Sequence, residues 1–148
     1  MSINGDPTLD ADAVEYAENG AVLIVDGLIA WAGQSGDEPA ELSAAAEHHD
    51  YGENLILPGF VDGHVHYPQI GVIASFGAQL LDWLEKYTFP EEARFSDADY
   101  AAQTAKLFLD LLLANGTTTA AVYCTVHPES ADAFFEESSA RNLRMIAG

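Results

Sequence analysis

The sequence predicts an α/β fold in which a small all-β segment precedes the first strands and helices of a parallel sheet. From residue 60 onward, β-branched runs alternate with helical patterns, and this alternation is typical of parallel strands joined by right-handed crossovers. Before that point, short apolar runs are separated mainly by turn residues. Because Pro58-Gly59 separates the two patterns, we expect one unit at 1–58 and a second at 59–148.

Composition excludes several classes of protein. The chain has 148 residues, 49% of them hydrophobic, which is enough for a globular core. It carries 24 acidic residues against 5 Lys and Arg, a formal net charge of −19. We therefore expect no nucleic-acid partner and no anionic membrane partner, since both repel such a chain. The acidity is spread along the chain, and one hypothesis is a high-salt habitat, where self-repulsion is screened.

The sequence also favours a cytoplasmic location. No apolar run approaches the ~18–20 residues that cross a bilayer. The first residues have neither the basic start nor the apolar centre of a signal peptide. The single Cys124 cannot form an internal disulfide, which fits a reducing compartment.

The first part is expected to contain short strands and one short helix. Asp26-Gly27 lies between two apolar runs and is typical of a type I′ hairpin, because Gly accepts a positive φ without cost. His48 and His49 lie in a polar turn and are expected to be solvated. The strands are expected at 13–17, 21–25, 28–32 and 54–57, and the helix at 40–46.

The second part is expected to alternate strands with helices. Apolar residues at helical spacing predict a helix at 78–86, which Phe89-Pro90 would end. A cap signal at Ser96-Asp97 opens a long apolar helix that Asn115-Gly116 ends. The remaining elements are strands at 60–65, 117–123 and 143–147, loops at 67–71 and 125–128, and a helix at 130–140 with Ser130 as its cap.

Two histidines, His64 and His66, stand at the end of the strand expected at 60–65. Alternate side chains of a strand share a face, so the two imidazoles are expected to point the same way. Such a pair suits Zn²⁺, which binds neutral histidine nitrogens at ~2.0–2.1 Å. The alternative is that both merely cap the strand and meet water. Ligand sites of parallel α/β folds gather at the carboxyl ends of strands, which favours the metal site.

The segment from Pro58 to His66 resembles the metal-dependent hydrolases of the amidohydrolase superfamily. Further segments resemble the guanine deaminase family in particular, and the resemblance covers roughly residue 54 to the end. It implies a (β/α)8 TIM-type barrel flanked by an N-terminal β-sandwich segment. The segments are Tyr67-Pro68-Gln69, 81–90 (LDWLEKYTFP), 116–120 (GTTTA), 125–128 (TVHP) and 144–148 (RMIAG).

The resemblance also implies roles for individual residues. His64 and His66 would be the first two ligands of one Zn²⁺. Gln69 would hydrogen-bond the purine, because an amide offers both donors and acceptors to the edge of a base. Cys124 is expected to pack and not to act as a nucleophile. Weaker candidates for lining the pocket, each of which can equally be a core or loop residue without a role, are Trp83, Tyr87, Tyr123 and His127.

The reaction implied by the resemblance is hydrolytic deamination of guanine to xanthine and ammonia. Zn²⁺ lowers the pKa of its bound water towards ~7, and the resulting hydroxide attacks the ring carbon that bears the amino group. A carboxylate shuttles the proton. The complete enzyme is expected to be a homo-oligomer with guanine as its small-molecule partner.

The chain departs from this family in one respect. The family's later histidines, its proton-shuttling glutamate and its late aspartate find no counterpart in these 148 residues, and a complete barrel needs ~250. We therefore expect an incomplete barrel that carries part of the site and is inactive alone. Two alternatives remain open: a non-catalytic fragment or assembly module derived from an amidohydrolase, and a deaminase of another aminated heterocycle.

Overall fold

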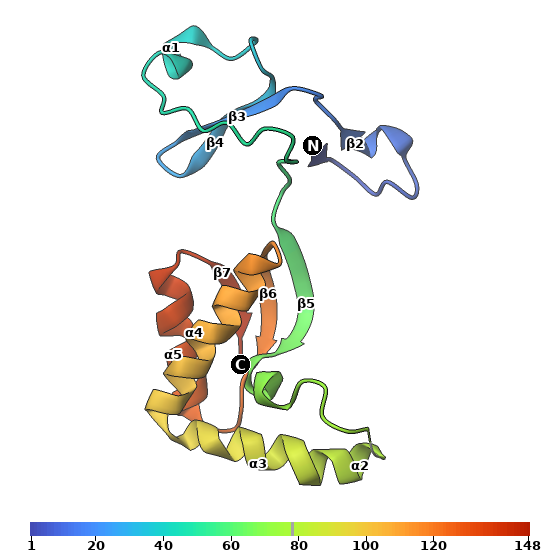
Figure 1. Ribbon diagram of the computed structural model, residues 1–148, viewed down its shortest axis with the longest axis vertical. Coiled ribbons are helices and arrows are strands. Elements are labelled where there is room, and N and C mark those ends of the chain that lie inside the picture. Colours follow the sequence, from blue (N-terminus) through green and yellow to red (C-terminus); the bar gives the residue numbers. More distant parts are fainter. Residues whose placement is uncertain (78) are drawn as a thin grey trace. The chain divides into compact units, whose positions relative to one another are not determined.

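A computed structural model describes residues 1–77 and 79–148 of the chain (Figure 1). The chain divides into two compact units, Met1–Pro58 and Gly59–Gly148. The sheets of the first unit are antiparallel pairs of strands. The sheet of the second unit is parallel. In the described part of the chain, no helix combines the length and the apolar character needed to cross a membrane.

The first unit contains two separate two-stranded sheets. Strand β1 (Ser2–Ile3) pairs with β2 (Val14–Glu15), and β3 (Gly20–Val25) pairs with β4 (Leu28–Gln34). The β3–β4 hairpin confirms the turn prediction, because Asp26 and Gly27 have φ values of 51° and 78°, as a type I′ turn requires. The β-sandwich expected for this unit stays a prediction.

Three expectations for the first unit are corrected. The strand expected at 13–17 shrinks to β2, which follows a 3-10 turn, η1 (Ala11–Ala13). Residues 54–57 form no strand; the carbonyl of Ile56 instead accepts a hydrogen bond from the terminal amino group of Met1 at 3.1 Å. The helix α1 (Ala40–Ser43) is shorter than expected. These segments bury little apolar surface, and burial is what usually stabilises short elements.

The second unit is built on a parallel sheet in the order β5-β6-β7. Its strands are β5 (Phe60–His66), β6 (Thr117–Tyr123) and β7 (Arg144–Ala147). Helices α4 (Ala98–Ala114) and α5 (Pro128–Ala140) lie side by side and cover one face of this sheet (Figure 1). The alternation of strands and helices predicted from residue 60 onward is confirmed.

The connection from β5 to α4 differs from the expected single helix. The loop expected at 67–71 is a 3-10 helix, and helical segments then continue past Pro90. Pro90 is tolerated because it lies in the first turn of a segment that follows a π-helix, where its missing N–H costs little. Ala78, the expected first residue of the helix, lies outside the described residues. The segments are η2 (Tyr67–Val72), α2 (Leu80–Trp83), the π-helix η3 (Leu84–Thr88), α3 (Phe89–Glu92) and η4 (Ala93–Ser96).

The ends of the two long helices test the cap predictions. The Asp97 carboxylate accepts the N–H groups of Asp99 and Tyr100, at 2.9 and 3.2 Å, and so caps α4 as predicted. Gly116, with a φ of 79°, ends α4 in the left-handed conformation, as expected. Ser130 does not cap α5, because it lies inside the first turn, where its hydroxyl accepts the N–H of Thr125 at 2.9 Å.

The core of the second unit lies between the sheet and α4 and α5. Tyr67 stands at its centre, fully buried, with its ring 5.2 Å from that of Phe95 and 5.1 Å from that of Phe134. Its hydroxyl donates a 2.6 Å hydrogen bond to the carbonyl of Ser130. Tyr67 directly follows His66, so this core contact fixes the backbone at the carboxyl end of β5.

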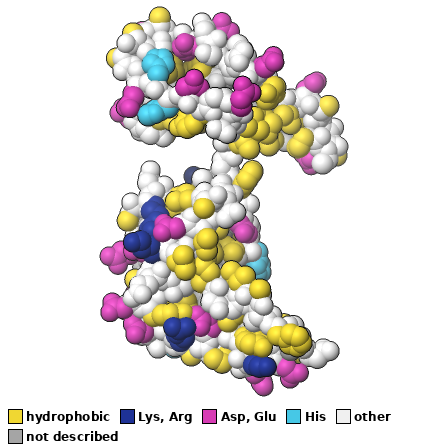
Figure 2. Space-filling model, viewed as in Figure 1, with side chains coloured by type: hydrophobic (Ala, Val, Ile, Leu, Met, Phe, Trp, Pro, Cys, Tyr) yellow, Lys and Arg dark blue, Asp and Glu magenta, His cyan; other side chains and the backbone are white. Residues whose placement is uncertain are grey.

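The opposite face of the sheet is open in the described part of this unit. It carries Val61, Tyr123 and Ile146, whose residues are 73%, 46% and 72% exposed. Figure 2 shows further hydrophobic side chains at the surface of the second unit, among the few Lys and Arg side chains. His66 pairs with Tyr123 across the sheet, so the histidines of β5 lie on this open face.

Candidate functional site

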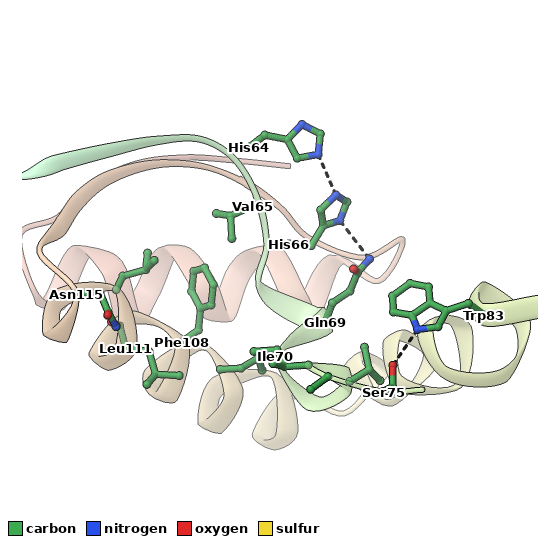
Figure 3. Close-up of a pocket in the computed structure, with 14 residues that line it drawn as sticks. His64, Val65, His66, Gln69, Ile70, Ser75, Trp83, Phe108, Leu111 and Asn115 are labelled. Atoms are coloured by element: carbon green, nitrogen blue, oxygen red, sulfur yellow. Dashed lines mark hydrogen bonds between the residues drawn. The ribbon is translucent and has the colours of Figure 1, made fainter. Parts of the chain in front are cut away.

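The two histidines of β5 converge. Their Nε2 atoms lie 3.2 Å apart, and their ring centroids lie 5.2 Å apart (Figure 3). Val65 between them packs against the core on the other face, as the alternation of a strand requires. The carboxylate of Asp62 accepts the backbone N–H of His64 at 3.0 Å, close to an irregularity in the pairing of β5 with β6. This contact braces the strand where it presents the first imidazole.

Tyr123 forms a wall beside the histidine pair. Its ring centroid lies 4.5 Å from that of His64 and 4.7 Å from that of His66, and it stacks on the second ring at an angle of 15°. The sheet causes this arrangement, because the register of β5 with β6 sets His66 opposite Tyr123. Tyr123, expected as a weak candidate for lining the site, is thus placed against both imidazoles.

The histidine pair has the spacing of two metal ligands. Two nitrogens bound to one tetrahedral Zn²⁺ are ~3.3 Å apart, given bonds of ~2.0–2.1 Å, and the observed separation is 3.2 Å. Neutral imidazole nitrogens are also the ligand type that zinc prefers. In the part of the chain that the structure describes, no group of three or more His, Cys, Asp or Glu is arranged to hold a metal ion. The pair therefore fits a zinc site and supplies two of its ligands.

Gln69 lies directly beside the pair, on η2. Its amide nitrogen is 3.4 Å from Nδ1 of His66 and donates a 3.1 Å hydrogen bond to the carboxylate of Glu92 on α3. Figure 3 shows His64, His66 and Gln69 in a row at the carboxyl end of β5. Sequence reasoning missed Glu92; its only signal was the pair of glutamates, Glu91 and Glu92, that follows the 81–90 segment that carries the family resemblance.

A cavity of about 630 Å³ opens beside these side chains. Trp83 forms part of its wall, and its indole N–H donates a 2.8 Å hydrogen bond to the hydroxyl of Ser75 (Figure 3). Most of the lining is apolar; the two histidines and Gln69 lie together on one side, and Asn115 lies on the other (Figure 3). The lining residues are His64, Val65, His66, Gln69, Ile70, Val72, Ile73, Ala74, Ser75, Trp83, Phe108, Leu111, Leu112 and Asn115.

Four of the residues singled out from the sequence lie outside this lining: Tyr123, which stacks on the histidines, and Tyr87, His127 and Cys124. Tyr87 belongs to η3, where the Lys86 ammonium lies 5.2 Å from the centre of its ring. His127 immediately precedes α5, and its N–H donates to the hydroxyl of Thr125 at 3.1 Å. Cys124 packs partly buried against the core, and burial raises the pKa of its thiol. A thiol held in its neutral form is a poor nucleophile, which agrees with a packing role.

Comparisons with known proteins point to one family. The model of the Amidohydrolase family matches residues 55–148. The guanine deaminase of Escherichia coli K12 is 46% identical over 138 residues, which cover 93% of this chain and 31% of that protein. The probable guanine deaminase of Deinococcus radiodurans is 45% identical over 141 residues, 93% of this chain and 32% of that protein. The chain thus spans about a third of the length of these two relatives.

Solved structures agree with the sequence relatives. The E. coli guanine deaminase structure matches with a TM-score of 0.89 at 45% identity, over 97% of this chain and 33% of that one. A guanine deaminase from C. acetobutylicum, solved with guanine bound in its active site, matches with a TM-score of 0.73 at 32% identity, over 86% of this chain and 30% of that one. The family match spans well over half of the residues, and the chain therefore belongs to the amidohydrolase family.

Proposed function

We propose that this chain is the N-terminal part of a zinc-dependent guanine deaminase, which hydrolyses guanine to xanthine and ammonia. One observation carries the proposal: His64, His66 and Gln69 converge at one end of a cavity of about 630 Å³. The substrate comes from the names of the relatives given above, which are guanine deaminases or a probable guanine deaminase.

In this proposal the second unit forms the first three strands of a (β/α)8 barrel. The support is the parallel order β5-β6-β7 with helices on one face and an open face that carries the histidines. In such barrels the helices lie outside, and active sites form at the carboxyl ends of the strands. His64 and His66 stand at that end of β5.

The two imidazoles would hold the zinc ion through their Nε2 atoms. A bound Zn²⁺ supplies an activated water by lowering its pKa towards ~7. Zinc sites normally have three or four protein ligands, so we assign the remaining ligands, and the carboxylates that move protons, to sequence outside these 148 residues. The ring of Tyr123, which lies against both imidazoles, would shield one side of them from bulk water.

Gln69 would bind the purine edge, at the end of the cavity where the two histidines lie. Its amide stands next to His66, so a base held by it lies close to the proposed metal position. Trp83 offers an aromatic surface in the same cavity. Substitution of Gln69 by Ala in the active protein is expected to weaken guanine binding by ~1–3 kcal/mol, the usual cost of an unsatisfied buried polar group.

The test is expression of this chain together with any coding sequence continuous with it in frame. Metal content is measured by mass spectrometry, and turnover by formation of xanthine and ammonia from guanine. His64→Ala and His66→Ala are expected to abolish both zinc retention and turnover. His48→Ala, at an exposed histidine of the first unit, is the matched control and should alter neither.

Three outcomes contradict separate parts of the proposal. Turnover of another aminated heterocycle in place of guanine contradicts the substrate. Full turnover in His64→Ala contradicts the metal assignment. Guanine turnover by the 148 residues alone contradicts the assignment of the missing ligands and proton-moving carboxylates to further sequence.

A further inference from the structure

Two adjacent glutamates at the end of α3 serve different partners. Glu91 accepts a 2.9 Å hydrogen bond from Arg94 and another from the hydroxyl of Tyr100. Glu92 accepts the 3.1 Å hydrogen bond from the amide nitrogen of Gln69. Among the described residues, Gln69 is the only side chain that donates to Glu92.

We infer that Glu92 is a positioning residue: its carboxylate fixes which end of the Gln69 amide is presented to a ligand. The inference rests on the proposed function of Gln69 in binding the purine. An ionised carboxylate only accepts hydrogen bonds, whereas an amide has one accepting end and one donating end. Glu92 therefore selects the orientation in which the NH₂ group of Gln69 faces α3.

This orientation decides the chemistry that Gln69 offers. The amide nitrogen makes the contact to Glu92, and this hydrogen bond alone sets the orientation, because Nδ1 of His66 carries the ring proton when Nε2 binds a metal. The carbonyl oxygen accepts no hydrogen bond from the described residues and is free to accept one. The amide therefore presents an acceptor to the cavity and selects a heterocycle edge with an N–H donor.

The two elements that carry this pair are packed closely enough to hold it. Gly71 on η2 lies so near α3 that a Cβ added to it would stand 2.3 Å from Oε1 of Glu91. Glu91 is in turn held by Arg94, whose guanidinium lies 3.8 Å from the centre of the Tyr100 ring. The backbone at Glu92 is thus anchored to η2 and α4 independently of its own side chain. Gln69 and Glu92 are both partly buried, so water screens their hydrogen bond only in part.

Exchange of Glu92 for Gln keeps the size of the side chain, but the new side chain no longer selects one orientation of the Gln69 amide. A Gln at position 92 both donates and accepts, so either orientation of the Gln69 amide can be paired. Guanine binding is expected to weaken about tenfold, the effect of losing one charge-assisted hydrogen bond that orders the site. Glu85→Gln makes the same change of charge at an exposed position of η3 and serves as the matched control.

The first measurement is the NMR spectrum of the Gln69 side-chain amide in the 148-residue chain, assigned through its loss in Gln69→Leu. In the wild-type chain one amide proton is expected downfield and protected from exchange with water. Glu92→Gln should shift it upfield and speed its exchange, while Glu85→Gln leaves it in place. Unchanged backbone amide signals of α4 and β6 show that the variant is folded. If Glu92→Gln does not fold, Glu92→Asp, whose carboxylate is one methylene too short to reach, should give the same upfield shift.

The second measurement is the guanine dissociation constant of the same variants, each expressed together with the coding sequence continuous with it in frame. Identical Gln69 amide signals in the wild type and Glu92→Gln would overturn the inference, whatever the guanine result. A shifted amide signal with guanine affinity unchanged from the wild type would overturn the positioning role. A protected amide in the wild-type chain, together with no guanine binding by the wild-type protein expressed with its in-frame continuation, speaks against the function proposed for this chain, and not against the orientation of Gln69 by Glu92.

Discussion

His64 and His66 direct their Nε2 atoms at each other, and the two nitrogens stand 3.2 Å apart at the carboxyl end of β5. Two neutral imidazoles at this distance share one proton, because one Nε2 must donate while the other accepts. A metal ion between them takes the place of that shared proton. The strand supplies the common face, and the stacked ring of Tyr123 restricts both imidazoles.

Loss of either imidazole is expected to remove metal binding by the chain. Even the loss of a residue that only supports a ligand costs ~10–100-fold in metal affinity, so the loss of a ligand itself should cost at least as much. His64→Ala and His66→Ala are compared with His48→Ala by calorimetric titration with Zn²⁺. Equal affinities of all three variants and the wild type would show that zinc binds elsewhere.

Gly59→Ala is expected to destabilise the second unit. A Cβ at this position would lie 2.0 Å from Oγ1 and 2.8 Å from Cβ of Thr118, so rotation of the threonine cannot relieve the clash. The start of β5 must then move away from β6, at a cost of ~1–3 kcal/mol in the free energy of unfolding. Gly63→Ala, inside β5 with open space around the added Cβ, is the control. Urea denaturation followed by circular dichroism measures both, and equal midpoints would contradict the clash.

Tyr67→Phe should lower the free energy of unfolding by ~0.5–1.5 kcal/mol, the net value of one hydrogen bond, because it removes the bond that the Tyr67 hydroxyl donates to the carbonyl of Ser130. Tyr16→Phe, at an exposed tyrosine of the first unit, is the control. A loss no larger than that of the control would show that the carbonyl finds another partner.

Burial also raises the pKa of the Tyr67 hydroxyl above its ordinary value of about 10. A pKa raised by folding contributes stability that is complete below the unfolded-state value and is lost as the pH rises towards the folded-state value. The wild-type chain is therefore expected to lose stability above about pH 10, and Tyr67→Phe should lose less over the same range. Denaturation midpoints at a series of alkaline pH values measure this difference, and parallel curves would contradict it.

Thr88→Val is expected to stabilise the chain. The Thr88 hydroxyl is buried and has no hydrogen-bond partner among the described residues. Valine has the same shape without the polar atom, so the free energy of unfolding should rise by about 1 kcal/mol. Thr104→Val is the control, because that hydroxyl donates to the carbonyl of Tyr100 at 2.9 Å. A loss of stability in Thr88→Val would indicate that its hydroxyl is hydrated inside the unit.

Added salt is expected to stabilise the folded chain. With 24 acidic residues against 5 Lys and Arg, self-repulsion opposes compaction, and salt shortens its range to ~3 Å at 1 M. The measurement is the urea midpoint at low and at molar potassium chloride, with sucrose as a neutral co-solute for comparison. A midpoint that does not rise with salt would count against the high-salt hypothesis.

Several elements could be predicted from the sequence because their signals are local. Strand β6 has the predicted bounds, since Thr117–Tyr123 is a β-branched run between a glycine stop and a loop. The cap at Asp97 and the turn at Asp26-Gly27 depend on a few neighbouring residues and were also predicted. The expected strand at 54–57 failed because an apolar run pairs only where a partner strand is available.

In the candidate site, too, some features follow from the local sequence and others only from the packing of the elements. The sequence by itself determined that His64 and His66 share a face at a strand end, because the alternation of a strand is a property of the local backbone. Only the tertiary structure decided which groups surround them: the register of β5 with β6 brought Tyr123 against both rings, and the packing of α3 on η2 brought Glu92 to Gln69. Helices that continue past Pro90 carry Glu92 there, across 23 positions of the chain. Contacts of this kind depend on how elements pack, and no local pattern of residue types encodes that packing.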